Sequence, residues 1–323
     1  MKKLTKFRTF ALVAFMALGF TSCNDDEDAP VVTPPDTTIT TLAVNTPNLS
    51  TLVRALTRTD LANTLKGAGP FTVFAPTNDA FNTLFTALGP NINVENVDVA
   101  VLKSILLNHV IASSIKSADI PASTYVKTLS PRTTAANAPT LSMFVQKSGS
   151  TVTLNGGINN KGAVVTTADI MASNGVIHIV NRVIQLPTIK DHAVANPNFS
   201  TLVSLLVEQN LAATLDGTAG SPFTVFAPVN SAFSTAVLGV YTGLSNENKT
   251  NLLLYHVVGG VNVLSTAIPT GQINTLFTGK SFSITGTAID DAGSTANKNI
   301  VVTDVQCSNG IVHAVDGVLL PNF

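Results

Sequence analysis

The chain has 323 residues, which is long for one domain and comfortable for two domains of roughly 100–150 residues each. Hydrophobic residues make up 45% of it, which excludes long disordered regions, whereas charged residues make up 11%, under half of the usual ~25%. There are 18 basic and 19 acidic residues, and from residue 37 onward 14 of each sign remain. A neutral chain without clustered Lys and Arg excludes nucleic acid as a partner.

The first 22 residues have the pattern of an export signal. A basic start at 2–8 precedes an apolar stretch at 10–20, which is too short for a membrane-spanning helix of ~20 apolar residues. The run LGFTSC at 18–23 resembles the lipobox of bacterial lipoproteins, in which the signal is removed before a cysteine that becomes acylated, although Phe20 replaces the usual leucine. We therefore predict a lipoprotein signal peptide at 1–22 and lipidation of Cys23, with an ordinary secretory signal as the alternative. Several acyl chains on one residue suffice for stable membrane anchoring.

Residues 23–38 have the composition of a flexible tether. The acidic run NDDED at 24–28 is followed by Pro30, Pro34 and Pro35, and such a segment cannot form a core. The acidic run is similar to the signal that directs some bacterial lipoproteins to the outer face of the outer membrane, so we expect a lipid-anchored protein exposed at the cell surface. The run lacks the spaced Asp and Gly of a calcium loop, and we predict no metal site there.

Four sequence blocks occur twice, which predicts two tandem domains at 39–187 and 188–323. The blocks are LSTLV (49–53) and FSTLV (199–203), FTVFAPTNDAF (71–81) and FTVFAPVNSAF (223–233), LLNHV (106–110) and LLYHV (253–257), and SNGVIHIV (173–180) and SNGIVHAV (308–315).

Each copy begins with an amphipathic helix, because the apolar residues from 49 to 56, and again from 199 to 206, follow the i, i+3, i+4, i+7 rule. The alternating strand at 71–75 comes next. A helix follows it, with its inner face expected at Phe81, Leu84, Phe85 and Leu88. Thr77 or Asn78 can cap this helix in the first copy, whereas Asn230 should do so in the second, because Val229 cannot.

The later part of each copy is richer in strands. A helix at 97–107 or 245–254 leads to the histidine block, and short strands follow at 141–146, 151–154 and 281–285. An Asn-Gly hairpin closes each copy, with Asn174 and Gly175 or Asn309 and Gly310 at its turn. Helices that come early and strands that come late indicate an α+β fold.

The phenylalanine-rich block, the histidine block and the Asn-Gly block, in this order and twice, resemble the fasciclin (FAS1) domain. The resemblance covers nearly everything from about residue 39 to residue 323. It implies two tandem wedge-shaped domains, each a two-sheet β-sandwich with packed helices. It also implies a binding or adhesion role outside the cytoplasm, without chemistry in most members.

Four of the five histidines fall in the repeated blocks: His109, His178, His256 and His313. Histidine suits metal binding and acid–base catalysis, but no His-Glu-x-x-His motif and no recurring third ligand accompany these four. A hydrogen bond that holds a strand to a helix is the favoured interpretation. Cys307 corresponds to Ala172 and is expected to be a buried thiol. We predict no catalytic residue, metal or cofactor.

The family resemblance also suggests binding residues. In animal members, an Asp-Ile pair before the last block and the residues around a Tyr-His pair are linked to integrin recognition. The corresponding candidates here are Asp169, Ile170, Asp304, Val305, Asn108, His109, Tyr255 and His256. Asn108 in place of tyrosine and Val305 in place of isoleucine depart from the family pattern.

The sequence therefore predicts a non-catalytic, surface-anchored lipoprotein. Its expected partners are extracellular matrix, glycans or cell-surface proteins, and the membrane through Cys23. The alternative is a protein that captures a small ligand such as a carbohydrate, a lipid or haem, because four histidines in two domains leave that open. The environment of those histidines distinguishes the two: an open cleft favours ligand capture, and burial with backbone partners favours a scaffold.

Overall fold

The computed structural model describes residues 37–323, and the predicted signal peptide, Cys23 and almost all of the predicted tether lie outside this range. The first domain contains five α-helices and seven strands: α1 (Ile39–Val44), α2 (Ser50–Arg58), α3 (Leu61–Lys66), β1 (Phe71–Pro76), α4 (Asn78–Leu88), α5 (Val99–Leu107), β2 (Val110–Ile111), β3 (Ser123–Pro131), β4 (Thr140–Ser148), β5 (Thr151–Leu154), β6 (Ala163–Ala172) and β7 (Gly175–Val180).

The second domain repeats this order. Its elements are α6 (Ile189–Ala195), α7 (Ser200–Glu208), α8 (Ala212–Asp216), β8 (Phe223–Pro228), α9 (Thr235–Gly243), α10 (Asn246–Leu254), β9 (Val257–Val258), β10 (Gly271–Asn274), β11 (Ser281–Thr285), β12 (Ala288–Asp290), β13 (Lys298–Cys307) and β14 (Gly310–Val315). Across residues 37–323, no helix has the length and hydrophobicity needed to cross a membrane.

Each domain contains one continuous series of seven strands. The order is β2-β1-β7-β6-β5-β4-β3 in the first domain and β10-β11-β12-β13-β14-β8-β9 in the second. β1 runs parallel to β7, and β8 runs parallel to β14, whereas the other pairs are antiparallel. The two layers expected of a sandwich are therefore joined through β6 or β13, which pairs with strands of both layers.

β6 and β13 are irregular at the same place. Between Val165 and Ile170, the strand uses two more residues than its partner β7, and between Ile300 and Val305 the strand β13 does the same against β14. The extra residues form β-bulges, which bend a strand and increase its local twist. Asp169 and Asp304 lie in these bulges with positive φ angles of 62° and 60°.

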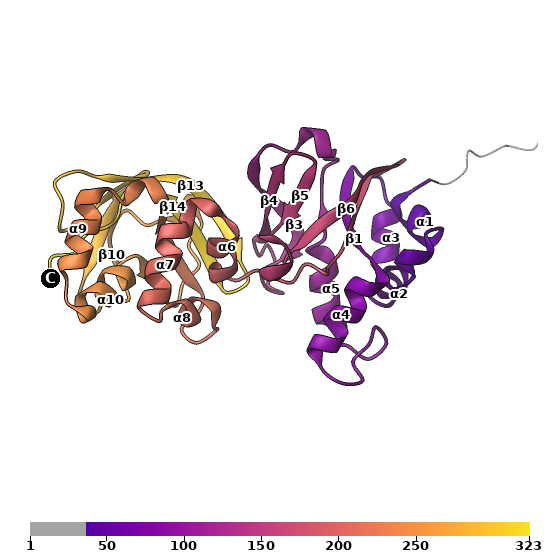
Figure 1. The fold of residues 1–323 in the computed structure, drawn as a ribbon, viewed down its shortest axis with the longest axis horizontal. Coiled ribbons are helices and arrows are strands. Elements are labelled where there is room, and N and C mark those ends of the chain that lie inside the picture. Colours follow the sequence, from indigo (N-terminus) through magenta and orange to yellow (C-terminus); the bar gives the residue numbers. More distant parts are fainter. Residues whose placement is uncertain (1–36) are drawn as a thin grey trace, which may run out of the picture. The chain divides into compact units, whose positions relative to one another are not determined.

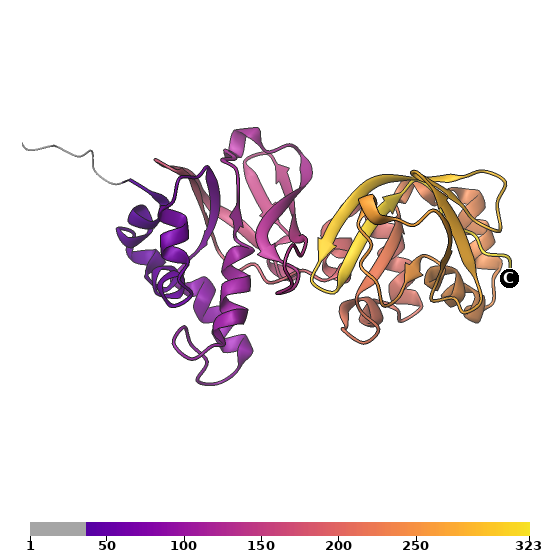
Figure 2. The same cartoon turned by 180° about the vertical axis from the view of Figure 1, so that it is seen from behind.

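Each domain has two apolar cores, one on either side of its central strand. In β1, Val73 and Ala75 face the core shared with the helices, and Phe74 faces the core enclosed by β3, β4 and β5. In both views of the fold, α1, α2 and α3 lie on one side of β1 and β6, and β3 to β5 lie on the other (Figures 1 and 2). The second domain repeats this division, with Val225 and Ala227 opposite Phe226.

Most of the predicted elements are confirmed, within a few residues at their ends. Thr77 caps α4, because its side chain accepts a hydrogen bond from the N–H of Ala80. The prediction for Asn230 is wrong: only a short 3-10 turn follows β8, and the next helix, α9, begins after Ser234, whose side chain caps it. Leu88 was expected on the inner face of α4 but is half exposed.

Candidate functional site

His109 and His256 connect the end of a helix to the chain that follows the last strand. The Nδ1 of His109 lies 2.7 Å from the carbonyl of Ile105 in α5, and its Nε2 accepts a hydrogen bond from the N–H of Ile184 at 2.9 Å. His256 makes the same pair of contacts with Leu252 and Leu319, at 2.9 Å each. Because Nε2 accepts, the ring is neutral and its proton is on Nδ1.

His178 and His313 hold the bulge to a loop rather than a strand to a helix. The Nδ1 of His178 accepts from the N–H of Asp169 at 3.2 Å, and its Nε2 lies 2.9 Å from the carbonyl of Ile115. His313 contacts Asp304 and Val263 in the same way, at 3.4 and 2.9 Å. Both rings stack on the phenylalanine of the central strand, with centroids 5.5 and 5.6 Å apart.

These contacts use both ring nitrogens of all four repeated histidines. Burial lowers the pKa of His109 and His256 to about 4, although the hydrogen bond to a helix carbonyl acts in the opposite direction. Burial also lowers the pKa of His313. Buried, neutral and fully hydrogen-bonded imidazoles have no nitrogen left for a metal or a substrate. In the part of the chain that the structure describes, no group of three or more His, Cys, Asp or Glu side chains could hold a metal ion.

The two bulge aspartates bind the loop as well. The carboxylate of Asp169 accepts hydrogen bonds from the N–H of Ser117, at 2.8 Å, and from its hydroxyl, and these bonds hold the pKa of Asp169 below its usual value. Asp304 binds Ser265 in the same way. Each bulge is therefore fixed by an aspartate, a serine and a histidine.

Among the binding candidates, only the two aspartates have polar side chains that are exposed enough to contact a partner. Asp169 is exposed and Asp304 is partly exposed, whereas Ile170 packs against the helical core and Val305 is buried. Tyr255 is fully buried and donates a hydrogen bond from its hydroxyl to the carbonyl of Ser281 at 2.7 Å. Asn108 is also buried, and its amide donates to the carbonyl of Gln185.

The hairpin asparagines hold two helices at once. Asn174 accepts a hydrogen bond from the N–H of Ile39 at the start of α1 and donates to the carbonyls of Leu65 and Gly67 at the end of α3. Asn309 makes the same contacts with Ile189, Leu215 and Gly217. The glycine that follows is required because a Cβ at Gly175 or Gly310 would lie about 2 Å from the carbonyl oxygen of Phe71 or Phe223. The Asn-Gly block is therefore structural.

The thiol of Cys307 is fully buried, and burial raises its pKa well above the usual value. Such a thiol is a poor nucleophile.

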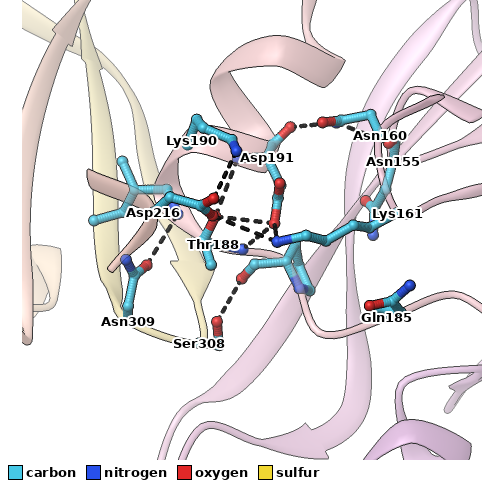
Figure 3. A network of polar contacts seen from close by, with 12 residues as sticks. Asn155, Asn160, Lys161, Gln185, Thr188, Lys190, Asp191, Asp216, Ser308 and Asn309 are labelled. Carbon is cyan, nitrogen blue, oxygen red and sulfur yellow. Dashed lines mark hydrogen bonds and ion pairs between the residues drawn. The ribbon is translucent and has the colours of Figure 1, made fainter. Parts of the chain in front are cut away.

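Sequence analysis missed the contacts that join the two domains. Figure 3 shows one group of them, around Asp191 in α6, whose side chain is 2% exposed. Lys161 of the first domain lies 3.0 Å from Asp191 and 3.4 Å from Asp216, and Lys190 lies 2.6 Å from Asp216. Asp191 also completes a capping box with Thr188 at the start of α6. The positive charge of a first-domain loop is thus neutralised by the second domain.

A second group of contacts joins β3 and β4 to β13 and α6. The ammonium of Lys127 donates to the carbonyl of Asp304, and the N–H of Gln306 donates to the hydroxyl of Ser142 at 2.9 Å. The ring of Tyr125 meets His192 edge-on, with centroids 5.5 Å apart, and its hydroxyl accepts from Asn196 at 3.2 Å. We call the two groups of contacts together the joint.

Beside the second group lies an open cleft of about 440 Å³. Strands β3, β4 and β13 and the turn after α6 form its walls. The cleft is lined mainly by hydroxyl, amide and aromatic groups, with one ammonium and one carboxylate, both already hydrogen-bonded within the protein. Of the predicted binding residues, Asp304 alone lines it.

One signal in the sequence could have indicated the joint. The two copies differ at positions of the second domain that the first domain covers. Asp191, His192 and Gln306 of the second copy correspond to Thr41, Leu42 and Met171 of the first. Met171 is exposed and Gln306 is fully buried, although both follow the same bulge. Differences between repeats at matching positions can therefore mark contacts that only one repeat makes.

Comparison with known proteins agrees with the repeated architecture. A family model described as the Fasciclin domain matches residues 47–187 and again residues 197–321. Human periostin is 26% identical over 310 residues, which are 94% of this chain and 34% of periostin, so the chain spans about a third of that relative. Protein sll1483 of Synechocystis is 37% identical over 139 residues, which are 42% of this chain and 73% of that protein.

Among solved structures, the FAS1 domain pair of the insect cell adhesion molecule fasciclin I is similar. It is 20% identical in sequence, with a TM-score of 0.48, and the match covers 87% of this chain and 95% of that one.

Proposed function

Because this chain belongs to the fasciclin domain family, with two tandem copies of the domain, we propose that it is a non-catalytic adhesion protein at the bacterial cell surface. The buried, fully hydrogen-bonded histidines support a binding role over a catalytic one. Similarity to periostin over 94% of the chain supports the same role at the level of the family.

We place the binding surface at the cleft beside the joint. Its hydroxyl and amide groups suit a ligand that is recognised by hydrogen bonds, and the sparse charge of the chain leaves little electrostatic attraction. The proposed partners are matrix glycans or glycosylated surface proteins. The volume of about 440 Å³ lies within the range of ligand-binding clefts, ~300–1,000 Å³.

Two neighbouring valines of β13 give a matched test of this surface. Val302 lines the cleft and is 41% exposed, whereas Val301 is 53% exposed and does not line it. We expect Val302→Glu to weaken binding to immobilised matrix glycans and proteins by about tenfold. Val301→Glu should bind like the unchanged protein. Equal binding by the two variants would exclude the cleft as the binding surface, and no binding by the unchanged protein would contradict the adhesion role.

The anchor is proposed from the lipobox-like run that ends at Cys23. We expect Cys23→Ser to move the protein from the membrane fraction to the soluble fraction, and to abolish labelling by a palmitate analogue. Whole-cell protease accessibility tests the surface location. Retention of Cys23→Ser in the membrane fraction would contradict lipidation at this cysteine.

A further inference from the structure

The first domain contains a pocket of about 290 Å³ that the adhesion role does not use. It lies between the loop at 114–121 and strands β3 and β4. Its apolar wall consists mainly of Phe74, Ile111, Ile115, Ile120, Val126 and Val145. The pocket has room for roughly ten water molecules, at about 30 Å³ each.

On the strands that form one wall of this pocket, the first domain has smaller side chains than the second. Val126 pairs with Met143 across β3 and β4, and the corresponding pair across β10 and β11 is Ile273 with Phe282. Both pairs face the core that contains the phenylalanine of the central strand. The first domain therefore has a valine and a methionine where the second has an isoleucine and a phenylalanine.

Two further positions show the same difference in side-chain size. Val145 pairs with Leu154 across β4 and β5, and the matching pair is Ile284 with Ile289. Asn108 stands where the second domain has Tyr255, whose ring packs edge-on against Phe282 with centroids 5.7 Å apart. At these positions of the two strand pairs and of the histidine block, the second domain carries the larger side chains, whereas Ile111 and Ile115 of the pocket correspond to the smaller Val258 and Val263.

The loop that covers the pocket is held in place from several directions. The carbonyl of Ile115 lies 2.9 Å from the ring of His178, and the N–H of Ile115 donates to the hydroxyl of Thr72 at 2.8 Å. Ser117 is bound by Asp169, and its carbonyl accepts a hydrogen bond from Lys147 at 2.7 Å. The pocket is therefore preformed, and Asp169 in the bulge of β6 and His178 in β7 position its wall.

The polar groups at the pocket indicate the charge of its ligand. Ser114, Asp119 and Thr124 are the only polar residues that line it, and Asp119 and Ser114 are exposed. A hydroxyl group on a ligand could bond to any of the three. No Lys, Arg or His side chain is among the residues that line the pocket, so a ligand carboxylate would have no cationic partner there and would lie near the charge of Asp119. The lining thus favours a neutral apolar molecule over a fatty acid.

We propose that this pocket of the first domain binds a neutral, apolar small molecule with at most one hydroxyl group, so that the protein carries such a ligand in addition to its adhesion role.

The test compares 1-octanol with octanoate, which share a chain length and differ in charge. Each is titrated into the full chain, and binding is followed by calorimetry and by the NMR signals of valine and isoleucine methyl groups. We expect octanol to saturate one site, to shift the methyl signals of Ile115, Val126 and Val145, and to bind at least about tenfold more tightly than octanoate. An absence of saturation, or shifts confined to the second domain, would overturn the proposal.

Variants that copy the second domain make the test specific. Val126→Ile together with Val145→Ile reduces the pocket with residues that the second domain already carries at the matching positions. We expect this variant to remain folded, by circular dichroism and thermal unfolding, and to lose octanol affinity by at least about tenfold. The matched control, Ile273→Val with Ile284→Val, alters the second domain and should leave octanol binding unchanged. Unchanged affinity in the first variant would overturn the site.

Asp119→Asn tests the charge argument by itself. It removes the negative charge at the rim without reducing the pocket. Octanoate should then bind more tightly than it binds the unchanged chain, although still less tightly than octanol, because the cost of desolvating its carboxylate remains. If octanoate binds Asp119→Asn as weakly as it binds the unchanged chain, the charge of Asp119 does not cause the preference for a neutral ligand, and that argument is overturned.

Discussion

Histidine occupies two different environments in this protein. His109, His178, His256 and His313 each use both ring nitrogens in hydrogen bonds to the backbone. The fifth, His192, is buried in the joint, where its ring faces backbone groups of Ser142 and Gln306 but makes no hydrogen bond of good geometry among the described residues. Burial lowers its pKa to about 4 as well, against the charge of Asp191. At His109, His192, His256 and His313, burial opposes the charged form of the ring.

The stability of the protein should therefore fall on acidification. The folded pKa of His109 and of His256 is about 4, below the ordinary value of about 6.5. Their contribution is fully present above pH 6.5 and is lost as the pH falls through about 4, because the unfolded chain binds the proton first. Each histidine corresponds to about 3 kcal/mol at full loss.

Chemical denaturation between pH 7 and pH 4.5 measures this loss. In His109→Gln/His256→Gln the free energy of unfolding should be lower at pH 7 but should depend less on pH than in the unchanged protein. The same pH dependence in both proteins would assign the acid sensitivity to other groups.

Among the candidate residues, the sequence located the hairpin and the strand that leads into it, but not the bulge in that strand. Asp169 and Ile170 are neighbours in sequence, yet one is exposed and the other packs on the helical core. A bulge shifts the alternation of a strand, so period-two reasoning does not hold across it. Periodicity could not identify the joint residues Tyr125 and Asn196, because contacts between domains leave no periodic pattern within either domain, and only a comparison of the two repeats points to them.

Secondary structure was more predictable where the pattern was local and repeated. The periodicity of α2 and α7 and the alternation of β1 and β8 were sufficient to locate these elements. The six-residue helix α1 and the seven-residue α6 were missed, because in each the first N–H donates a hydrogen bond to a hairpin asparagine far away in sequence. A short helix held by tertiary contacts has little periodicity of its own, although the capping box of Thr188 and Asp191 does mark the start of α6 in the sequence.

One capping position distinguishes α4 from the short 3-10 turn at the matching place in the second domain. Asn78 and Asn230 play the same structural role, because their side chains accept hydrogen bonds from the N–H groups of Thr51 in α2 and Thr201 in α7. The residue before each asparagine decides whether a long helix forms there. Thr77 caps an 11-residue helix, whereas Val229 offers no side-chain oxygen and a short turn results.

Loss of this cap should destabilise the first domain. Thr77→Val is expected to lower the free energy of unfolding by about 0.5–2 kcal/mol, because the N–H of Ala80 loses its acceptor. Denaturant titration followed by circular dichroism measures the change. Thr77→Ser keeps the oxygen and serves as the control, and an equal loss in both variants would contradict the capping role.

For the whole molecule, the charged part of the joint couples the stability of the two domains. Burial tends to lower the pKa of Lys161, but its hydrogen bond to Asp191 and the charges of Asp191 and Asp216 outweigh this and raise it. Removal of Lys161 leaves the carboxylate of Asp191, which is 2% exposed, without its cation. Such a change is costly, although the side chain of Lys161 is 38% exposed and solvent reduces the effect.

We expect Lys161→Met to lower the free energy of unfolding by about 1–3 kcal/mol. It should also broaden the distance between spin labels at Asn82 and Val240, one in each domain, as measured by pulsed electron paramagnetic resonance. Lys103→Met changes an exposed lysine of α5 and is the control. A distance distribution as narrow as that of the unchanged protein would show that the joint does not depend on this lysine.

The joint also gives the order of the two domains along the chain a physical meaning. Tyr125, Phe144 and Lys127 belong to the first domain alone, and the matching strand registers of the second domain carry Gln272, Ser283 and Asn274. A recombinant chain that placed the second domain before the first would retain both hydrophobic cores. It would bring Gln272 and Ser283 opposite Leu42 and Met171, and no aromatic ring or ammonium would be there to meet them. The order of the two copies along the chain therefore decides whether the residues of the joint meet.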